Sequence, residues 1–175
     1  ASYRNRANAK QNLGDYQGAI DDSSKAIEIN PDDANAYSNR ANVKHMSGDH
    51  QGSIDDSNIA IELNANLVPA YNNRGNAKDD LGNHQGAIDD YTKALEINPN
   101  SAPAYYNRGI SKWKLGHLKG AIDDFNKALE IDPNYADSLV YRGIVKHELG
   151  DYKDSIEDYS QALMINTYDA TAYNN

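Results

Sequence analysis

The stretch AYYNRGISKWKLGHLKGAIDDFNKALEIDPNY, residues 104–135, decides the fold, because copies of it recur along the chain. Neighbouring copies start at Ala70 and Ser138, and two earlier ones start at Tyr3 and Tyr37. A glycine recurs every 34 residues, at Gly14, Gly48, Gly82, Gly116 and Gly150. Self-similarity at a fixed period of this length predicts a tandem array of one small structural unit.

Each unit is predicted to hold two amphipathic helices. Residues 104–115 and 119–131 carry apolar or small side chains at three- and four-residue spacing, which is typical of helices with one buried face. Gly116 ends the first helix and Pro133 ends the second. Thr167 and Ala65 replace that proline in two units, so we expect softer boundaries there. The repeats are predicted at 1–33, 34–67, 68–101, 102–135 and 136–169, and residues 170–175 open a sixth.

Small residues occupy the positions where two helices must approach closely. They form the columns Ala7, Ala41, Gly75, Gly109, Gly143 and Ala19, Ser53, Ala87, Ala121, Ser155. Aromatic side chains fill the space beside them, at Tyr91, Phe125 and Tyr159. With these columns in phase, the sequence resembles a tetratricopeptide repeat protein over essentially its whole length. The resemblance implies an all-α, right-handed superhelical solenoid of antiparallel helix pairs, whose first helices line the concave surface.

The composition agrees with such an array. The 175 residues are 39% hydrophobic and include no cysteine, which excludes a disulfide framework and a thiolate metal site. No apolar run approaches the roughly 18 residues needed to cross a bilayer. We expect a soluble, cytoplasmic array. Neither end resembles a polar cap, so we also expect a fragment of a longer protein and end-to-end self-association through uncapped terminal repeats.

The charged residues form columns that predict internal ion pairs. The net charge is −9, from 17 basic and 26 acidic residues. An arginine column, Arg6, Arg40, Arg74, Arg108 and Arg142, runs in phase with acidic doublets. We predict pairing with the second acid of each doublet: Asp22, Asp56, Asp90, Asp124 and Asp158. The column of Lys10, Lys44, Lys78, Lys112 and Lys146 is also predicted to be structural. Because every arginine of this column has an acid in phase, a nucleic-acid partner is not expected.

Asparagines are the candidate ligand-binding residues of the first helices. One column holds Asn5, Asn39, Asn73 and Asn107, and another holds Asn8, Asn42 and Asn76. The two columns are three residues apart, so they share a helix face. An amide that both donates and accepts suits the alternating N–H and C=O groups of an extended peptide. The alternative is that these asparagines only tie neighbouring repeats together.

A carboxylate clamp, which chaperone-binding members of this family use to hold a partner's C-terminus, fits poorly. Its places in the first two repeats hold suitable residues, Arg4, Asn8 and Asn39. In the third repeat, however, Pro69 and Asn73 stand where the clamp has two cations. We therefore predict a groove without a clamp.

The later repeats place apolar residues where the earlier ones have asparagine or serine. These residues are Tyr106, Ile110, Trp113, Val140, Tyr141 and Ile144. An exposed aromatic cluster on a concave surface is a candidate binding anchor. The alternative is that they cover the first helix of the next repeat. The groove is thus predicted to have a polar half that reads backbone and an apolar half that reads side chains.

No catalytic, metal or cofactor site is predicted. The five histidines, His45, His50, His84, His117 and His147, show no i, i+4 pair on one helix, and no glycine-rich phosphate loop occurs. The favoured function is a scaffold that binds an extended peptide segment of a partner protein. The alternative is a structural or assembly module that stacks end to end or spaces other domains.

Overall fold

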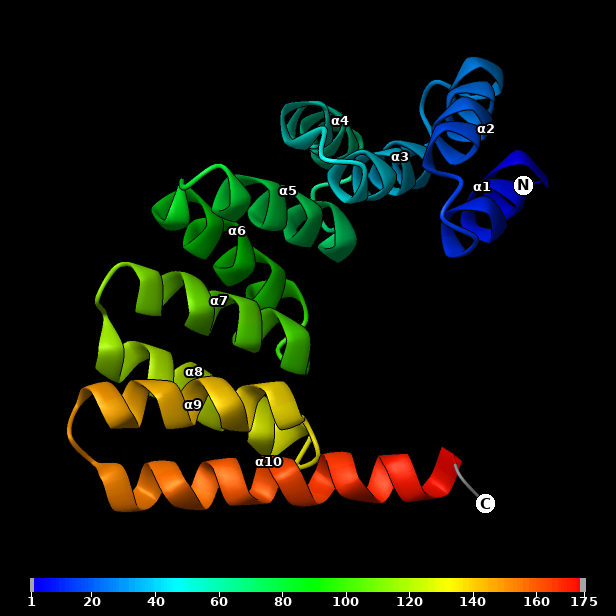
Figure 1. Ribbon diagram of the computed structural model, residues 1–175. Helices are drawn as coiled ribbons and strands as arrows, with labels where there is room; N and C mark the ends of the chain where they lie inside the picture. The colour runs from blue at the N-terminus through cyan, green and yellow to red at the C-terminus, as the bar shows by residue number, and fades with distance from the viewer. Residues whose placement is uncertain (1, 174–175) are drawn as a thin grey trace. The chain divides into compact units, whose positions relative to one another are not determined.

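A computed structural model of the chain describes residues 2–173, and side chains over residues 2–165. Over this range it contains ten α-helices and no strand (Figure 1). The helices are α1 (Ser2–Asn12), α2 (Tyr16–Ile29), α3 (Ala34–Met46), α4 (His50–Leu63), α5 (Val68–Asp80), α6 (His84–Ile97), α7 (Ala102–Lys114), α8 (Leu118–Ile131), α9 (Ala136–Glu148) and α10 (Tyr152–Tyr173). No helix among the described residues has the length and apolar character needed to cross a membrane.

The chain forms two compact units. The first, Ala1–Ile97, contains α1 to α6, and the second, Asn98–Asn175, contains α7 to α10. In each unit the two helices of a repeat pack as a hairpin, and the second helix also packs against the first helix of the following repeat. First helices touch as well, in the pairs α1 with α3, α3 with α5, and α7 with α9. Each unit therefore has one surface built from first helices.

The hairpin turn needs a residue with positive φ. Gly116 has φ 78°, and in the described residues positive φ occurs only at the glycine of each of the five turns. The His117 N–H donates to the Lys112 carbonyl at 2.9 Å, and the Gly116 N–H donates to the Trp113 carbonyl at 2.8 Å. These bonds satisfy carbonyls that the end of the helix leaves unpaired. The predicted glycine turn is confirmed.

Glycine also makes room for the aromatic side chains between the two helices of a repeat. A Cβ added at Gly109 would lie 2.7 Å from Phe125 Cε1, and one added at Gly75 would lie 2.8 Å from Tyr91 Cε1. In the first repeat the same two positions hold Ala7 and a small partner, Ser23. The later three repeats thus pair a glycine with a ring, whereas the first repeat pairs an alanine with a serine.

The last helix differs from the predicted boundary. The sequence predicts that the fifth repeat ends at residue 169 with a softened boundary at Thr167 and that a sixth repeat opens at residue 170, but α10 runs without interruption to Tyr173. Threonine keeps its backbone N–H, so it does not end a helix as proline does. At Ala65, which also replaces proline, α4 does end, because Asn64 is extended and its side chain accepts from the Asn66 N–H. Residues 174 and 175 lie outside the described residues.

Candidate functional site

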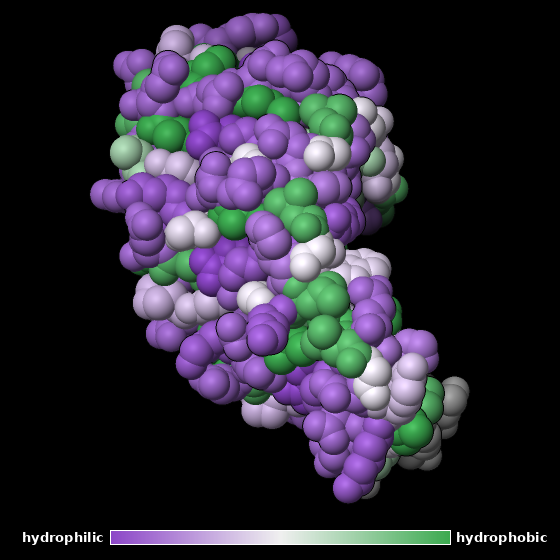
Figure 2. Space-filling model, turned by 90° about the vertical axis from the view of Figure 1, so that its left-hand side faces the viewer, coloured by the Kyte–Doolittle hydropathy of each residue, from purple (hydrophilic) through white to green (hydrophobic). Residues whose placement is uncertain are grey.

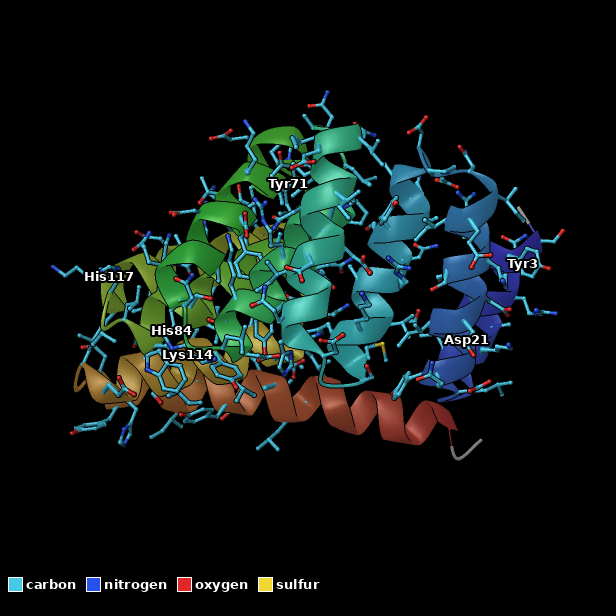
Figure 3. The ribbon with its side chains drawn as sticks, turned by 90° about the horizontal axis from the view of Figure 1, so that it is seen from above. Tyr3, Asp21, Tyr71, His84, Lys114 and His117 are labelled. Carbon is cyan, nitrogen blue, oxygen red and sulfur yellow. The ribbon has the colours of Figure 1, made fainter. Side chains whose placement is uncertain are left out.

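A buried carboxylate joins the two helices of every repeat. Asp124 accepts from Arg108 Nε at 2.9 Å and from Nη2 at 2.7 Å, and Lys112 Nζ lies 2.7 Å from its second oxygen. The prediction that arginine pairs with the second acid is confirmed in all five repeats, where the buried acids are Asp22, Asp56, Asp90, Asp124 and Asp158. The first acid of the doublet is exposed, as Asp21 shows on α2 (Figure 3).

These networks use both cation columns. The lysine column pairs with the same five carboxylates, as the sequence predicted. The Arg6 guanidinium beside Asp22 holds the pKa of that carboxyl well below its usual range. A tyrosine lies under the arginine as well: the Arg108 guanidinium carbon is 5.4 Å from the centre of the Tyr105 ring. The arginines and lysines of these two columns therefore have carboxylate partners within the protein.

Two of the predicted groove asparagines form contacts within the protein. Asn73 Nδ2 on α5 donates to the Ser38 carbonyl on α3 at 2.9 Å and lies 3.3 Å from the Ser38 hydroxyl. Asn76 Oδ1 accepts from the Tyr91 hydroxyl at 2.7 Å. Asn73 thus joins neighbouring repeats, which is the alternative weighed above, and Asn76 joins the two helices of its own repeat.

The earlier asparagines are differently placed. Asn5 and Asn8 are exposed on α1, and Asn39 and Asn42 are half-buried on α3. Within the described part of the chain these four side chains have no hydrogen-bond partner. Arg4, predicted to lie beside them, has its Nη1 3.3 Å from Asp33 Oδ2. The first unit therefore carries a row of available amides on α1 and α3.

The apolar residues of the second unit form an aromatic cluster. The Tyr141 ring on α9 lies 5.6 Å from the Tyr106 ring and 5.7 Å from the Trp113 ring, both on α7, with edge-to-face geometry. Trp113 Nε1 also donates to Glu148 at 2.9 Å. Tyr106, Ile110, Trp113 and Tyr141 pack against buried residues of α8 and α9, including Phe125. Burial raises the pKa of the Tyr106 phenol.

This cluster is packed and partly accessible at once. Tyr106 and Trp113 contact Tyr141 on the next repeat's first helix, as the alternative proposed. Tyr106, Trp113 and Tyr141 nevertheless each keep intermediate exposure. Ile144 and Asn107 are likewise half-buried, on α9 and α7. The aromatic residues thus lie on the first-helix surface of the second unit with their orientation set by internal contacts.

Sequence reasoning missed one side-chain cluster in the first unit. His45 on α3, His50 on α4 and Asp80 on α5 place their ligand atoms within 4.8 Å of one another. The sequence signal that could have revealed this cluster is an offset of 35 residues between side chains of neighbouring repeats. It joins Gln11 to Met46 and Trp113 to Glu148, as it joins His45 to Asp80.

Comparison with known families decides what the repeats are. Tetratricopeptide repeat models match residues 68–101, 102–135 and 125–157, and a TPR repeat model matches residues 7–48. The chain belongs to the tetratricopeptide repeat family. Its repeats are accordingly TPR hairpins. The first helices of the second to fifth repeats are α3, α5, α7 and α9, which begin at Ala34, Val68, Ala102 and Ala136.

Several solved TPR structures share this fold. A crystal structure of MamA is 22% identical with a TM-score of 0.84, over 94% of this chain and 96% of that one. MamA from Desulfovibrio magneticus RS-1 is 18% identical with a TM-score of 0.84, over 95% and 94%. YrrB, described as a TPR protein with an unusual peptide-binding site, is 23% identical with a TM-score of 0.74, over 93% and 84%. No curated protein matches the sequence significantly.

Proposed function

We propose that this chain is a non-catalytic scaffold that holds an extended segment of a partner protein on the surface formed by its first helices. The observation that carries the proposal is the row of amides on α1 and α3 that have no partner among the described residues. An amide can donate to a peptide carbonyl and accept from a peptide N–H, so such a row matches a backbone of any sequence.

The spacing of the first helices suits an extended ligand. Packed helices lie about 8–10 Å apart, and an extended chain advances about 3.3 Å per residue. Each successive first helix therefore meets the ligand at about every third residue. Asn39 and Asn42 lie one helical turn apart on α3, so together they can bind a donor and an acceptor of the same peptide segment.

Two further observations support the proposal. The fold resembles that of YrrB, which is described as having a peptide-binding site. The half-exposed rings of Tyr106, Trp113 and Tyr141 provide apolar area of the kind that anchors ligand side chains. Figure 2 shows one face of the molecule, which is mostly hydrophilic with separate hydrophobic patches.

The test is a screen of the purified chain against a peptide array, followed by titration of the best peptide. The variant is Asn39→Ala with Asn42→Ala, because neither amide has a hydrogen-bond partner among the described residues. Asn73→Ala is unsuitable, since loss of its bond to Ser38 would also weaken repeat stacking. Asn66→Ala, an exposed loop amide, is the matched control. We expect at least a tenfold loss of affinity in the double variant at unchanged helicity.

Equal affinity of the double variant and Asn66→Ala would contradict the asparagine row as the binding site. A peptide that binds the second unit instead would change Trp113 fluorescence, since that indole lies on the α7 surface beside Tyr141. Absence of any peptide binding would remove the scaffold proposal itself.

A second candidate function, end-to-end assembly, is favoured by the outer face of α10. Ile156 is 65% exposed, whereas its counterparts Ile20, Ile54 and Ile122 are half-buried. A first helix from another copy could cover Ile156 as following helices cover its counterparts. Light scattering should then show growth of chains with concentration, abolished by Ile156→Glu. A monomer at all concentrations would exclude this candidate.

A further inference from the structure

We propose that His45, His50 and Asp80 bind a first-row divalent transition-metal cation, with Zn²⁺ as the reference ion, and thereby link the second and third repeats. His45 Nε2 lies 2.7 Å from Asp80 Oδ2, and His50 Nδ1 lies 3.8 Å from the same oxygen. These residues come from α3, α4 and α5, so one ion would connect three helices.

The distances match the size of a zinc ion. Zinc binds histidine nitrogen and carboxylate oxygen at about 2.0–2.2 Å, so two ligand atoms of a tetrahedral site lie about 3.3 Å apart. The measured separations of 2.7 and 3.8 Å lie on either side of that value, and all ligand atoms fall within 4.8 Å. Small rotations of the Asp80 and His45 side chains would equalise them.

One histidine nitrogen of the cluster is available for a ligand. His50 Nδ1 is shielded from solvent and has no hydrogen-bond partner, which is an unfavourable state for a buried polar atom. A metal ion would satisfy it. The two imidazole rings lie 5.3 Å apart and are tilted by 59°, so they do not stack on each other.

Charge and access also favour a cation. Asp80 supplies one negative charge between two imidazoles, and its side chain is 47% exposed. Its exposed side gives a route from solvent and a place for a water ligand. Two imidazoles and one carboxylate suit Zn²⁺, Ni²⁺, Cu²⁺ or Fe²⁺, whereas Mg²⁺ and Ca²⁺ prefer oxygen ligands.

The cluster is specific to one place among the described residues. The equivalent positions in the first and fourth repeats carry Gln11 and Tyr16, and Trp113 and Leu118. In the fifth repeat His147 faces Tyr152, with ring centres 5.1 Å apart. Elsewhere in the described side chains no other trio of His, Cys, Asp or Glu has its ligand atoms this close.

The experiment uses the chain without a histidine tag, treated with a chelator and then titrated with Zn²⁺ by calorimetry. We expect saturable binding of one ion per chain, and a visible absorption band typical of low coordination number when Co²⁺ replaces Zn²⁺. We expect a rise in Tm on Zn²⁺ addition, because an ion that binds only the folded state stabilises it. Binding should weaken in acid, since protons compete for the imidazoles.

The variants borrow residues that the array already accommodates. His45→Gln and His50→Leu install the side chains found at the same positions as Gln11 and Leu118, and Asp80→Asn keeps the shape of the carboxylate. Each should lower Zn²⁺ affinity at least tenfold. His147→Gln is the matched control, because it changes the equivalent histidine of the fifth repeat, and it should bind Zn²⁺ as the wild type does.

Any of three results would overturn the proposal. The first is the absence of saturable Zn²⁺ binding by the wild-type chain. The second is binding that survives in Asp80→Asn and His45→Gln, and the third is an equal loss of binding in His147→Gln. Helicity measured by circular dichroism verifies that each variant is folded, and Asp80→Asn provides the conservative replacement.

Discussion

Tyr91 and Asn76 form a hydrogen bond inside the third repeat that the fourth repeat replaces by an apolar contact. The Tyr91 hydroxyl donates to Asn76 Oδ1 at 2.7 Å, and the tyrosine is 2% exposed. One period later the same positions hold Phe125 and Ile110, which belong to one packed cluster. We therefore consider a double-mutant cycle, Tyr91→Phe with Asn76→Ile, which gives the third repeat the two side chains of the fourth.

The expected free energies follow from which group is left without a partner. Tyr91→Phe removes a donor from the half-buried Asn76 amide, at a cost of about 1 kcal/mol. Asn76→Ile leaves the buried Tyr91 hydroxyl without its acceptor and should cost about 2 kcal/mol. Replacing both by apolar groups should cost less than the two single changes together, because neither the hydroxyl nor its acceptor is then left without the other. The two changes are therefore less than additive, with a coupling of about 1–3 kcal/mol between the two positions.

The assay is urea unfolding of the four proteins, followed by far-ultraviolet circular dichroism. Amide hydrogen exchange in α5 and α6 should locate the change, because repeat arrays can open locally. Comparable m-values are required before free energies are compared. A double variant as unstable as the sum of the two single variants would contradict this coupling, because the two side chains would then contribute independently.

Three other changes have defined outcomes. Gly109→Ala should cost about 1–3 kcal/mol by pressing on Phe125, and a thermal melt equal to that of the wild type would contradict it. Asp124→Ala should lower the free energy of unfolding by about 3 kcal/mol, because it removes the carboxylate that pairs with two partly buried cations. The change at the adjacent, exposed Asp123→Ala should stay within about 0.5 kcal/mol. Asp22 has a depressed pKa in the folded state, so its contribution is complete above about pH 4 and is lost as the pH falls; the stability gap to Asp22→Asn should close in acid.

The repeat itself was readable in the sequence because its contacts are short in range. Arg108 and Asp124 are 16 residues apart and belong to one hairpin. Gly109 and Phe125 are also 16 apart, and steric fit alone requires the glycine. Each relation recurs in several repeats, so the columns reveal residues that act together even without related sequences.

The groove was less readable, because helical spacing shows which residues share a face but not what touches them. Asn73 and Asn39 occupy the same column, yet Asn73 is bonded to Ser38 on the preceding repeat. Asn39 would need a similar acceptor at residue 4, where Arg4 instead pairs with Asp33. Whether an asparagine of this column bonds the preceding repeat or remains available therefore depends on the residue that the neighbouring repeat places beside it.

Residues within one repeat suffice to specify the period, the glycine turn and the ion pair of each hairpin, because all of these form over short separations in the chain. Contacts between repeats determine the rest. His45 meets Asp80 at an offset of 35 residues, and Trp113 meets Glu148 at the same offset. Such contacts join side chains of unlike kinds from different repeats, so no column of like residues reveals them, and only packing in three dimensions brings them together.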